Sequence, residues 1–188
     1  RLKQIMQVFL KEKNFEACGD LDEVTEDMKV LIAAQGCLLL VGLKKHDFYR
    51  KLRSILVYPV AFHDRGRRRF DLRQERERSM LGESWSSGSV VLSWESVKAG
   101  AKSDDDGMNV VYHEFAHQLD QADGAADGVP ILSDKAAYGE WSRIFQREYE
   151  ELVEDADDPR SDPLLDTYGA QNPAEFFSVS TETFFEES

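Results

Sequence analysis

Apolar residues recur at helical spacing in several stretches of this chain, and the pattern predicts helices at both ends. The first ten residues place apolar side chains every three or four positions, so a short amphipathic helix opens the chain. Thr25, followed by two acids, predicts the start of a helix through Met28–Leu40, which is apolar nearly all round and suits a core. Ser133 begins another amphipathic pattern. Asn172 before Pro173 predicts a last helix, with asparagine as its cap and proline at its first position.

The middle of the chain contains two runs of β-branched and aromatic residues that predict strands. These are Ser54–Phe62, where Pro59 favours an edge position, and Ser89–Trp94. After the second run, Ser103 precedes three aspartates, whose carboxylates suit the positive end of a helix dipole. We therefore expect a helix that Ser103 caps and that ends near Gln121.

Length and composition indicate one globular domain over residues 1–188. Apolar residues make up 41% of the 188, which excludes a disordered chain and a small disulfide scaffold. The net charge of −13 argues against direct binding of nucleic acid. Residues 101–188 carry 22 acids and 5 bases, which indicates either a solvated acidic surface or a local attraction for cations. The two cysteines, Cys18 and Cys37, are predicted to be buried free thiols in a reducing compartment.

A basic segment over about residues 63–88 interrupts this acidic chain. Seven arginines lie between Arg65 and Arg78 with few apolar neighbours, which predicts an exposed loop. The loop is either simply solvated or a docking surface for an acidic partner. The longest apolar run, Val30–Leu43, is shorter than the roughly 20 residues that a membrane span needs. With no secretory signal recognised at the start, we expect a cytoplasmic protein that does not bind membranes.

The sequence His113-Glu114-Phe115-Ala116-His117 is an HExxH motif inside the helix predicted before Gln121. Residues four apart lie on one helix face, so both imidazoles can reach one metal ion. Glu114 can touch a metal-bound water without binding the metal, and can act as a general base. The alternative is a pair of surface histidines, but the neighbouring apolar residues predict a buried helix, where such groups need partners. Asp120 follows on the same face, where it either holds an imidazole or lies exposed at the helix end.

A catalytic zinc takes three protein ligands and one open position, so a third ligand is required. Three carboxylates are candidates. Asp123 would suit a metzincin arrangement, but Asp120 stands where that arrangement has glycine. Glu175 lies on the last helix and could supply a distant ligand, or it could reach back to the N–H of its own cap residue, Asn172. Glu182 lies seven residues further along the same helix.

Several strings, in the order expected, carry a resemblance to a known family: VLIAAQGCLLLVGL, ILVYP, GESW, SVVLSW, HEFAHQLD, DTYGAQNPAEFF and TETFF. Over roughly residues 24–185 the chain resembles the Mlc titration factor A family of zinc-dependent peptidases. The resemblance implies one Zn²⁺ per chain, with His113, His117 and Glu175 as ligands and Glu114 as the catalytic base. It also matches Tyr168 to a tyrosine near the metal, where a phenol could donate a hydrogen bond to the developing oxyanion.

We therefore expect an α+β, zincin-like metallopeptidase domain. In it a small mixed sheet packs on the HExxH helix, and a second helix supplies the Glu ligand. The predicted function is hydrolysis of peptide substrates, and the resemblance suggests aminopeptidase-like cleavage of short peptides. The alternative function, also implied by the resemblance, is a regulatory protein that binds a transcriptional repressor, with peptidase activity secondary. Nothing in the sequence is typical of a coiled coil, so we expect a monomer.

Overall fold

 The computed structural model describes residues 1–44, 46–60, 88–102 and 107–187 of the chain, and the basic segment lies almost entirely outside these ranges. The chain divides into two compact units, Arg1–Lys102 and Ser103–Ser188, and each is described by itself. The expectation of one domain over 1–188, with the sheet packed on the HExxH helix, stays a prediction.

The first unit is a small parallel sheet with helices. Its elements are α1 (Leu2–Glu12), β1 (Asn14–Ala17), α2 (Glu26–Val41), β2 (Ser54–Tyr58), β3 (Ser89–Ser93) and α5 (Trp94–Gly100). The described strands pair in parallel in the order β1-β2-β3, where a mixed sheet was expected. β2 is central in this sheet, so the edge position inferred from Pro59 is wrong. Pro59 follows the last residue of the strand and removes no donor from it.

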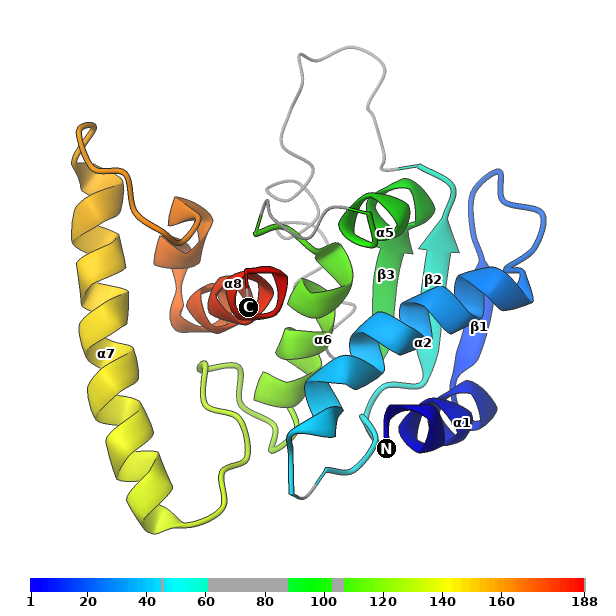
Figure 1. The fold of residues 1–188 in the computed structure, drawn as a ribbon, viewed down its shortest axis with the longest axis horizontal. Helices are drawn as coiled ribbons and strands as arrows, with labels where there is room; N and C mark the ends of the chain where they lie inside the picture. Colours follow the sequence, from blue (N-terminus) through cyan, green and yellow to red (C-terminus); the bar gives the residue numbers. More distant parts are fainter. Residues whose placement is uncertain (45, 61–87, 103–106, 188) are drawn as a thin grey trace. The chain divides into compact units, whose positions relative to one another are not determined.

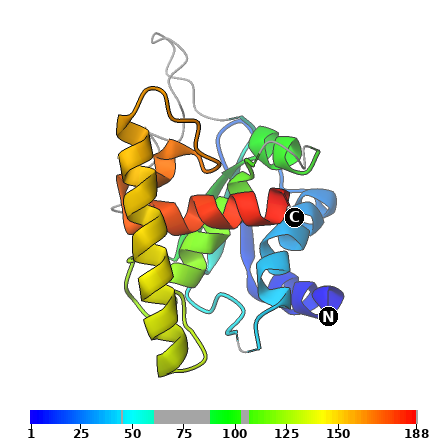
Figure 2. The same cartoon turned by 60° about the vertical axis from the view of Figure 1, so that its left-hand side comes forward.

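Two helices of the first unit, α1 and α2, lie over one face of its sheet (Figures 1 and 2). Phe15, Ile55 and Val90 are aligned across the three strands and therefore point to the same face. The ring of Phe9 from α1 lies 6.2 Å from that of Phe15, edge to face. α1 and α2 lie together on this side of the sheet (Figures 1 and 2). The two helices therefore bury the apolar face that the strand pattern predicts.

The second unit is helical in the part that the structure describes. Its elements are α6 (Val110–Asp120), α7 (Lys135–Asp157), the 3₁₀ helix η1 (Thr167–Gln171) and α8 (Pro173–Glu186). α6 packs along α8, and η1 contacts both α7 and α8. α7 presents Trp141, Phe145 and Tyr149, one helical turn apart, to the aromatic start of α8 at Phe176 and Phe177. This aromatic contact is the core that positions α8.

Most helix starts agree with the sequence prediction, because short-range capping decides them. Thr25 caps α2 through the N–H of Met28, and Asn172 caps α8 through the N–H of Glu175. α6 is the exception. It begins at Val110 with Asn109 as its cap, so the predicted start at Ser103 is wrong, and residues 103–106 lie outside the described part. The sequence pattern also missed β1, α5 and η1, which are all short.

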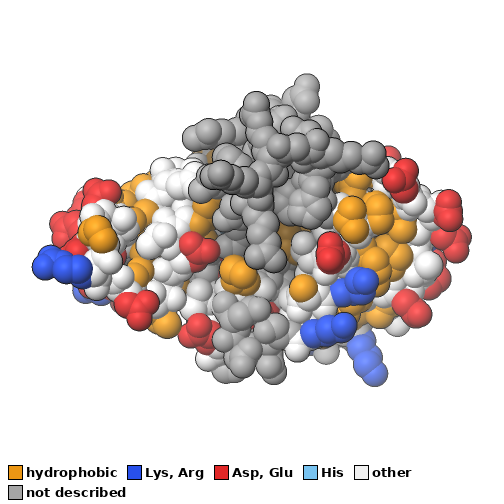
Figure 3. Space-filling model, turned by 90° about the horizontal axis from the view of Figure 1, so that it is seen from above, with side chains coloured by type: hydrophobic (Ala, Val, Ile, Leu, Met, Phe, Trp, Pro, Cys, Tyr) orange, Lys and Arg blue, Asp and Glu red, His pale blue; other side chains and the backbone are white. Residues whose placement is uncertain are grey.

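Figure 3 shows acidic side chains of the described residues at several separate places on one face, among apolar and neutral side chains. Of the two cysteines, Cys37 is buried and Cys18 is partly exposed, so the predicted burial of Cys18 is wrong. Among the described residues, none of the helices has both the length and the apolar character needed to cross a membrane.

Candidate metal centre

α6 carries both motif histidines on its buried face. Asn109 caps this helix, because its Oδ1 accepts hydrogen bonds from the N–H groups of Val111 (3.0 Å) and Tyr112 (3.2 Å). His113 and His117 follow one turn apart and are 4% and 1% exposed. Their Nε2 atoms lie 3.1 Å apart and their rings stand nearly perpendicular, at 80°. The predicted convergence of the two imidazoles is therefore present in the structure.

Glu175 of α8 completes a triangle with these two nitrogens. Its Oε2 lies 3.1 Å from Nε2 of His113 and 3.4 Å from Nε2 of His117, and the residue is 1% exposed. The cap of α8 uses the backbone of Glu175, because its N–H donates a hydrogen bond to Oδ1 of Asn172. The side-chain carboxylate of Glu175 lies against the two histidines. Among the described residues, these three form the one group of His, Cys, Asp or Glu side chains close enough to hold a metal ion.

The spacing of the three atoms fits a tetrahedral zinc site. Ligand atoms about 2.0–2.1 Å from a tetrahedral zinc lie about 3.3–3.4 Å from one another. The three separations here, 3.1, 3.1 and 3.4 Å, are within a few tenths of an ångström of that value. Two imidazoles and one carboxylate are also a donor set that zinc accepts in catalytic sites. The residues present therefore fit the metal that the sequence predicts.

The pKa values of His113 and Glu175 depend on the charged groups that surround them. Burial by itself lowers the pKa of His113, but hydrogen bonds with Glu175 and Glu182 outweigh it and raise the pKa to about 10. Burial likewise raises the pKa of Glu175, but the two histidines outweigh it and lower the pKa to about 2. Without a metal, a proton on His113 therefore balances the carboxylate. A cation bound by the three side chains would take the place of this proton.

The other two candidate third ligands lie elsewhere. Asp123 is exposed, and its Oδ1 accepts a hydrogen bond from the N–H of Ala125 in the loop after α6. Glu182 is buried against the opposite side of the His113 ring, with its Oε2 2.9 Å from Nδ1. Neither belongs to the triangle of atoms that includes Glu175.

The remaining predicted residues border the cluster. Tyr168 is buried in η1, and the centre of its ring lies 6.1 Å from that of His113. Glu114 is half-buried on α6, directly after the first histidine. Asp120 is fully buried, and burial raises its pKa to about 6. Its Oδ1 accepts a hydrogen bond from the N–H of Val129, so it holds the loop after α6, and its predicted contact with an imidazole stays a prediction.

Sequence reasoning missed the part played by Asn109, whose backbone and side chain both contact α8. Its N–H donates to Glu182 and its Nδ2 donates to Glu186, each at 2.9 Å. An asparagine before an apolar helical run is a cap signal. In the sequence, the three aspartates after Ser103 form a stronger cap signal than Asn109.

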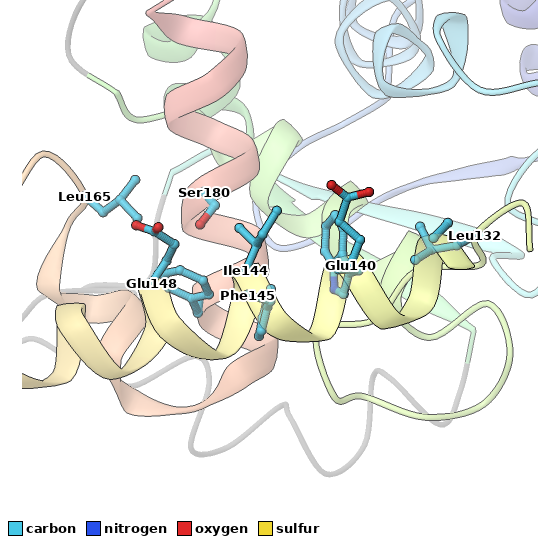
Figure 4. Close-up of a pocket in the computed structure, with 10 residues that line it drawn as sticks. Leu132, Glu140, Ile144, Phe145, Glu148, Leu165 and Ser180 are labelled. Atoms are coloured by element: carbon cyan, nitrogen blue, oxygen red, sulfur yellow. The ribbon is translucent and has the colours of Figure 1, made fainter. Parts of the chain in front are cut away.

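The second unit also contains an apolar groove of about 530 Å³ beside α7 (Figure 4). Trp141, Ile144 and Phe145 of α7 and Phe176 of α8 contribute to its lining, and Glu140 and Glu148 are its charged residues. The groove contains neither histidine nor cysteine, so it offers little to a zinc ion. Among the described residues, the cluster between α6 and α8 is therefore the candidate metal site.

Comparison with known proteins agrees with this geometry. The family model described as "Glucose-regulated metallo-peptidase M90" matches residues 1–188. Uncharacterized protein slr2042 of Synechocystis is 41% identical over 189 residues, which cover 99% of this chain and 68% of that protein. Proteins named Mlc titration factor A are 31% identical in Klebsiella pneumoniae and 32% in Pectobacterium atrosepticum, over 98% of this chain and 69% of each relative. The family resemblance read from the sequence is confirmed, and the chain belongs to the glucose-regulated metallo-peptidase family M90.

Proposed function

We propose that this protein is a zinc-dependent peptidase that hydrolyses peptide bonds with His113, His117 and Glu175 as the metal ligands. The observation that carries the proposal is the triangle of two Nε2 atoms and one carboxylate oxygen, 3.1–3.4 Å apart and buried. Membership of a metallo-peptidase family supports it. Zinc bound there would polarise the scissile carbonyl and lower the pKa of its water toward about 7.

The protein's own side chains would then handle the proton and the charge on the substrate. Glu114 follows the first ligand on α6 and is half-buried, so its carboxylate can accept a proton from the attacking water and return it to the leaving amine. Tyr168 lies beside His113, and its hydroxyl would donate a hydrogen bond to the oxygen on which negative charge develops. Burial of the three ligands keeps competing water away from them.

The first test is the zinc content per chain, measured by elemental analysis on purified wild type, Glu175→Ala and Asp123→Ala. We expect about one zinc in wild type and in Asp123→Ala, and a marked loss in Glu175→Ala. Asp123 is the matched control because it is a carboxylate near the motif but outside the cluster. Full zinc in Glu175→Ala would refute the ligand set. Absence of zinc from wild type after zinc is supplied would refute the metal site.

The second test addresses the reaction. Glu114→Gln should keep zinc and lose hydrolysis of short peptides, because the amide cannot accept the proton. Undiminished hydrolysis would refute Glu114 as the base. The aminopeptidase-like activity is tested with one peptide carrying either a free or an acetylated N-terminus. Preference for the free amine would support it, and equal cleavage would indicate an endopeptidase.

A second candidate function is binding of a transcriptional repressor, and the name Mlc titration factor A of the relatives supports it. In this case the metal cluster need not take part. Binding of a purified Mlc-type repressor by wild type and by His113→Ala, measured by calorimetry, separates the two functions. Retention of binding by His113→Ala would make binding independent of hydrolysis. Absence of binding by wild type would refute this candidate.

A further inference from the structure

We infer that Glu182 is a positioning residue for the metal site: it holds His113 so that Nε2 faces the metal, and it couples that histidine to the start of α6. The inference rests on the proposed zinc site and concerns a residue outside its ligand set. It is carried by two contacts of one carboxylate. Oε2 lies 2.9 Å from Nδ1 of His113, and Oε1 lies 2.9 Å from the backbone nitrogen of Asn109.

The first contact determines how the His113 ring is presented. A carboxylate accepts hydrogen bonds, so the Nδ1 atom that faces Glu182 carries the proton and donates it. In the neutral imidazole that a metal requires, Nε2 is then left with its lone pair. Nε2 is the nitrogen that lies beside Glu175 and His117. Glu182 therefore selects both the tautomer and the ring orientation that bind a cation.

The second contact places the helix that carries the histidine. The N–H of Asn109 donates to Glu182, and the side chain of Asn109 caps α6. One turn further along α8, Oε1 of Glu186 accepts a hydrogen bond from Nδ2 of the same asparagine at 2.9 Å. α8 therefore holds the start of α6 with two carboxylates. In the contacts described, Glu182 accepts hydrogen bonds from both Asn109 and His113, and Glu186 accepts one from Asn109.

Because Glu182 is buried, the loss of either of its hydrogen bonds would not be replaced by water. Glu182 is 0% exposed, and a carboxylate buried to this extent is costly unless both oxygens accept hydrogen bonds. Here each oxygen accepts one N–H. Glutamine at this position offers a single acceptor oxygen, so one of the two N–H groups would face an amide NH₂. The substitution therefore removes part of the arrangement with almost no change of volume.

The experiment compares Glu182→Gln with Glu186→Gln as a matched control on the same helix. Zinc affinity is measured for both and for wild type by competition with a chromophoric chelator. We expect Glu182→Gln to weaken zinc binding about 10–100-fold, the usual effect of losing a partner of a metal-bound histidine. Glu186→Gln removes a buried carboxylate from the same cap residue but not from the histidine, so its affinity should stay within about threefold of wild type. Urea unfolding of the metal-free variants shows whether both remain folded.

A spectroscopic measurement on wild type tests the same inference without a substitution. With ¹⁵N-labelled histidine and zinc bound, ¹H–¹⁵N spectra report the chemical shift and the solvent exchange of the Nδ1 proton of His113. A strongly downfield, slowly exchanging Nδ1 proton, which indicates a hydrogen bond to a buried carboxylate, would support the inference, also where Glu182→Gln fails to fold. An Nδ1 proton that exchanges freely with solvent, or equal weakening of zinc binding by the two glutamine variants, would overturn it. Wild type that binds no zinc would overturn the proposed function itself, so the two failures are distinguishable.

Discussion

Replacing Gly128 with alanine should disturb the start of α8, the helix that carries Glu175. Gly128 lies in the loop between α6 and α7 with φ at +78°, a backbone conformation that side chains disfavour. A Cβ atom added there would meet the ring of Phe145 and would lie 2.6 Å from the carbonyl oxygen of Pro173. Pro173 begins α8, two residues before Glu175. We therefore predict that Gly128→Ala destabilises the second unit and weakens zinc binding.

The magnitude follows from these two effects. The left-handed conformation costs alanine about 1–2 kcal/mol. Forcing a methyl group into a packed site costs about 1–3 kcal/mol more. The smaller entropy of the unfolded alanine chain offsets about 0.4–1 kcal/mol of this. The free energy of unfolding should therefore fall by about 1–4.6 kcal/mol.

Gly139 provides the control, because it lies within α7 and an added Cβ would have no atom within 4 Å. Gly139→Ala should raise the free energy of unfolding by about 0.5–1 kcal/mol through helix propensity. Both variants are measured by urea unfolding, followed by circular dichroism. With a slope of about 2 kcal/mol per molar urea, the midpoint should fall by about 0.5–2.3 M in Gly128→Ala and rise slightly in Gly139→Ala. A Gly128→Ala midpoint equal to that of wild type would refute the reasoning.

Three further predictions concern charge, metal and thiols. The pKa of His113 is raised from 6.5 to about 10 in the metal-free fold, so its contribution to stability is full below pH 6.5 and is lost as pH rises through 10. The difference in unfolding free energy between wild type and His113→Gln should shrink over that range in urea titrations, and a constant difference would contradict the assignment. Zinc at 100 times its dissociation constant should raise the free energy of unfolding of wild type by about 2.7 kcal/mol and leave Glu175→Ala nearly unchanged, and equal gains would contradict the ligand set. Burial raises the pKa of the Cys37 thiol to about 12. A thiol reagent at pH 8 should therefore label the partly exposed Cys18 first and Cys37 only on unfolding. Rapid labelling of both cysteines would contradict the packing of α2.

The sequence by itself predicts the features that short-range interactions control. The caps at Thr25 and Asn172 act over three residues, so the starts of α2 and α8 can be read from the chain. The HExxH spacing places His113 and His117 on one face of a helix, whatever surrounds that helix. The family resemblance adds the role of Glu175, because its motifs are separate and in order.

Local patterns are weaker where two of them compete or where an element is short. Three aspartates predict a helix start at Ser103, but α6 begins after Asn109. The side chain of Asn109 donates to Glu186 and its N–H to Glu182, so contacts with a distant helix support the later start. The strand Asn14–Ala17 has four residues and a mostly exposed pattern, and pairing with β2 defines it.

Spacing along the chain does not determine which carboxylate meets the histidines, and the tertiary structure does. Asp123, Glu175 and Glu182 have the same chemistry, and the spacing along the chain does not rank them. Packing of α8 along α6 directs Glu175 to the two Nε2 atoms and Glu182 to the Nδ1 atom of the first histidine. Asp123 stays in the exposed loop. Helical periodicity determines which residues share a face, but only the contact between two helices determines which atoms lie 3 Å apart, because that distance depends on residues some sixty positions away along the chain.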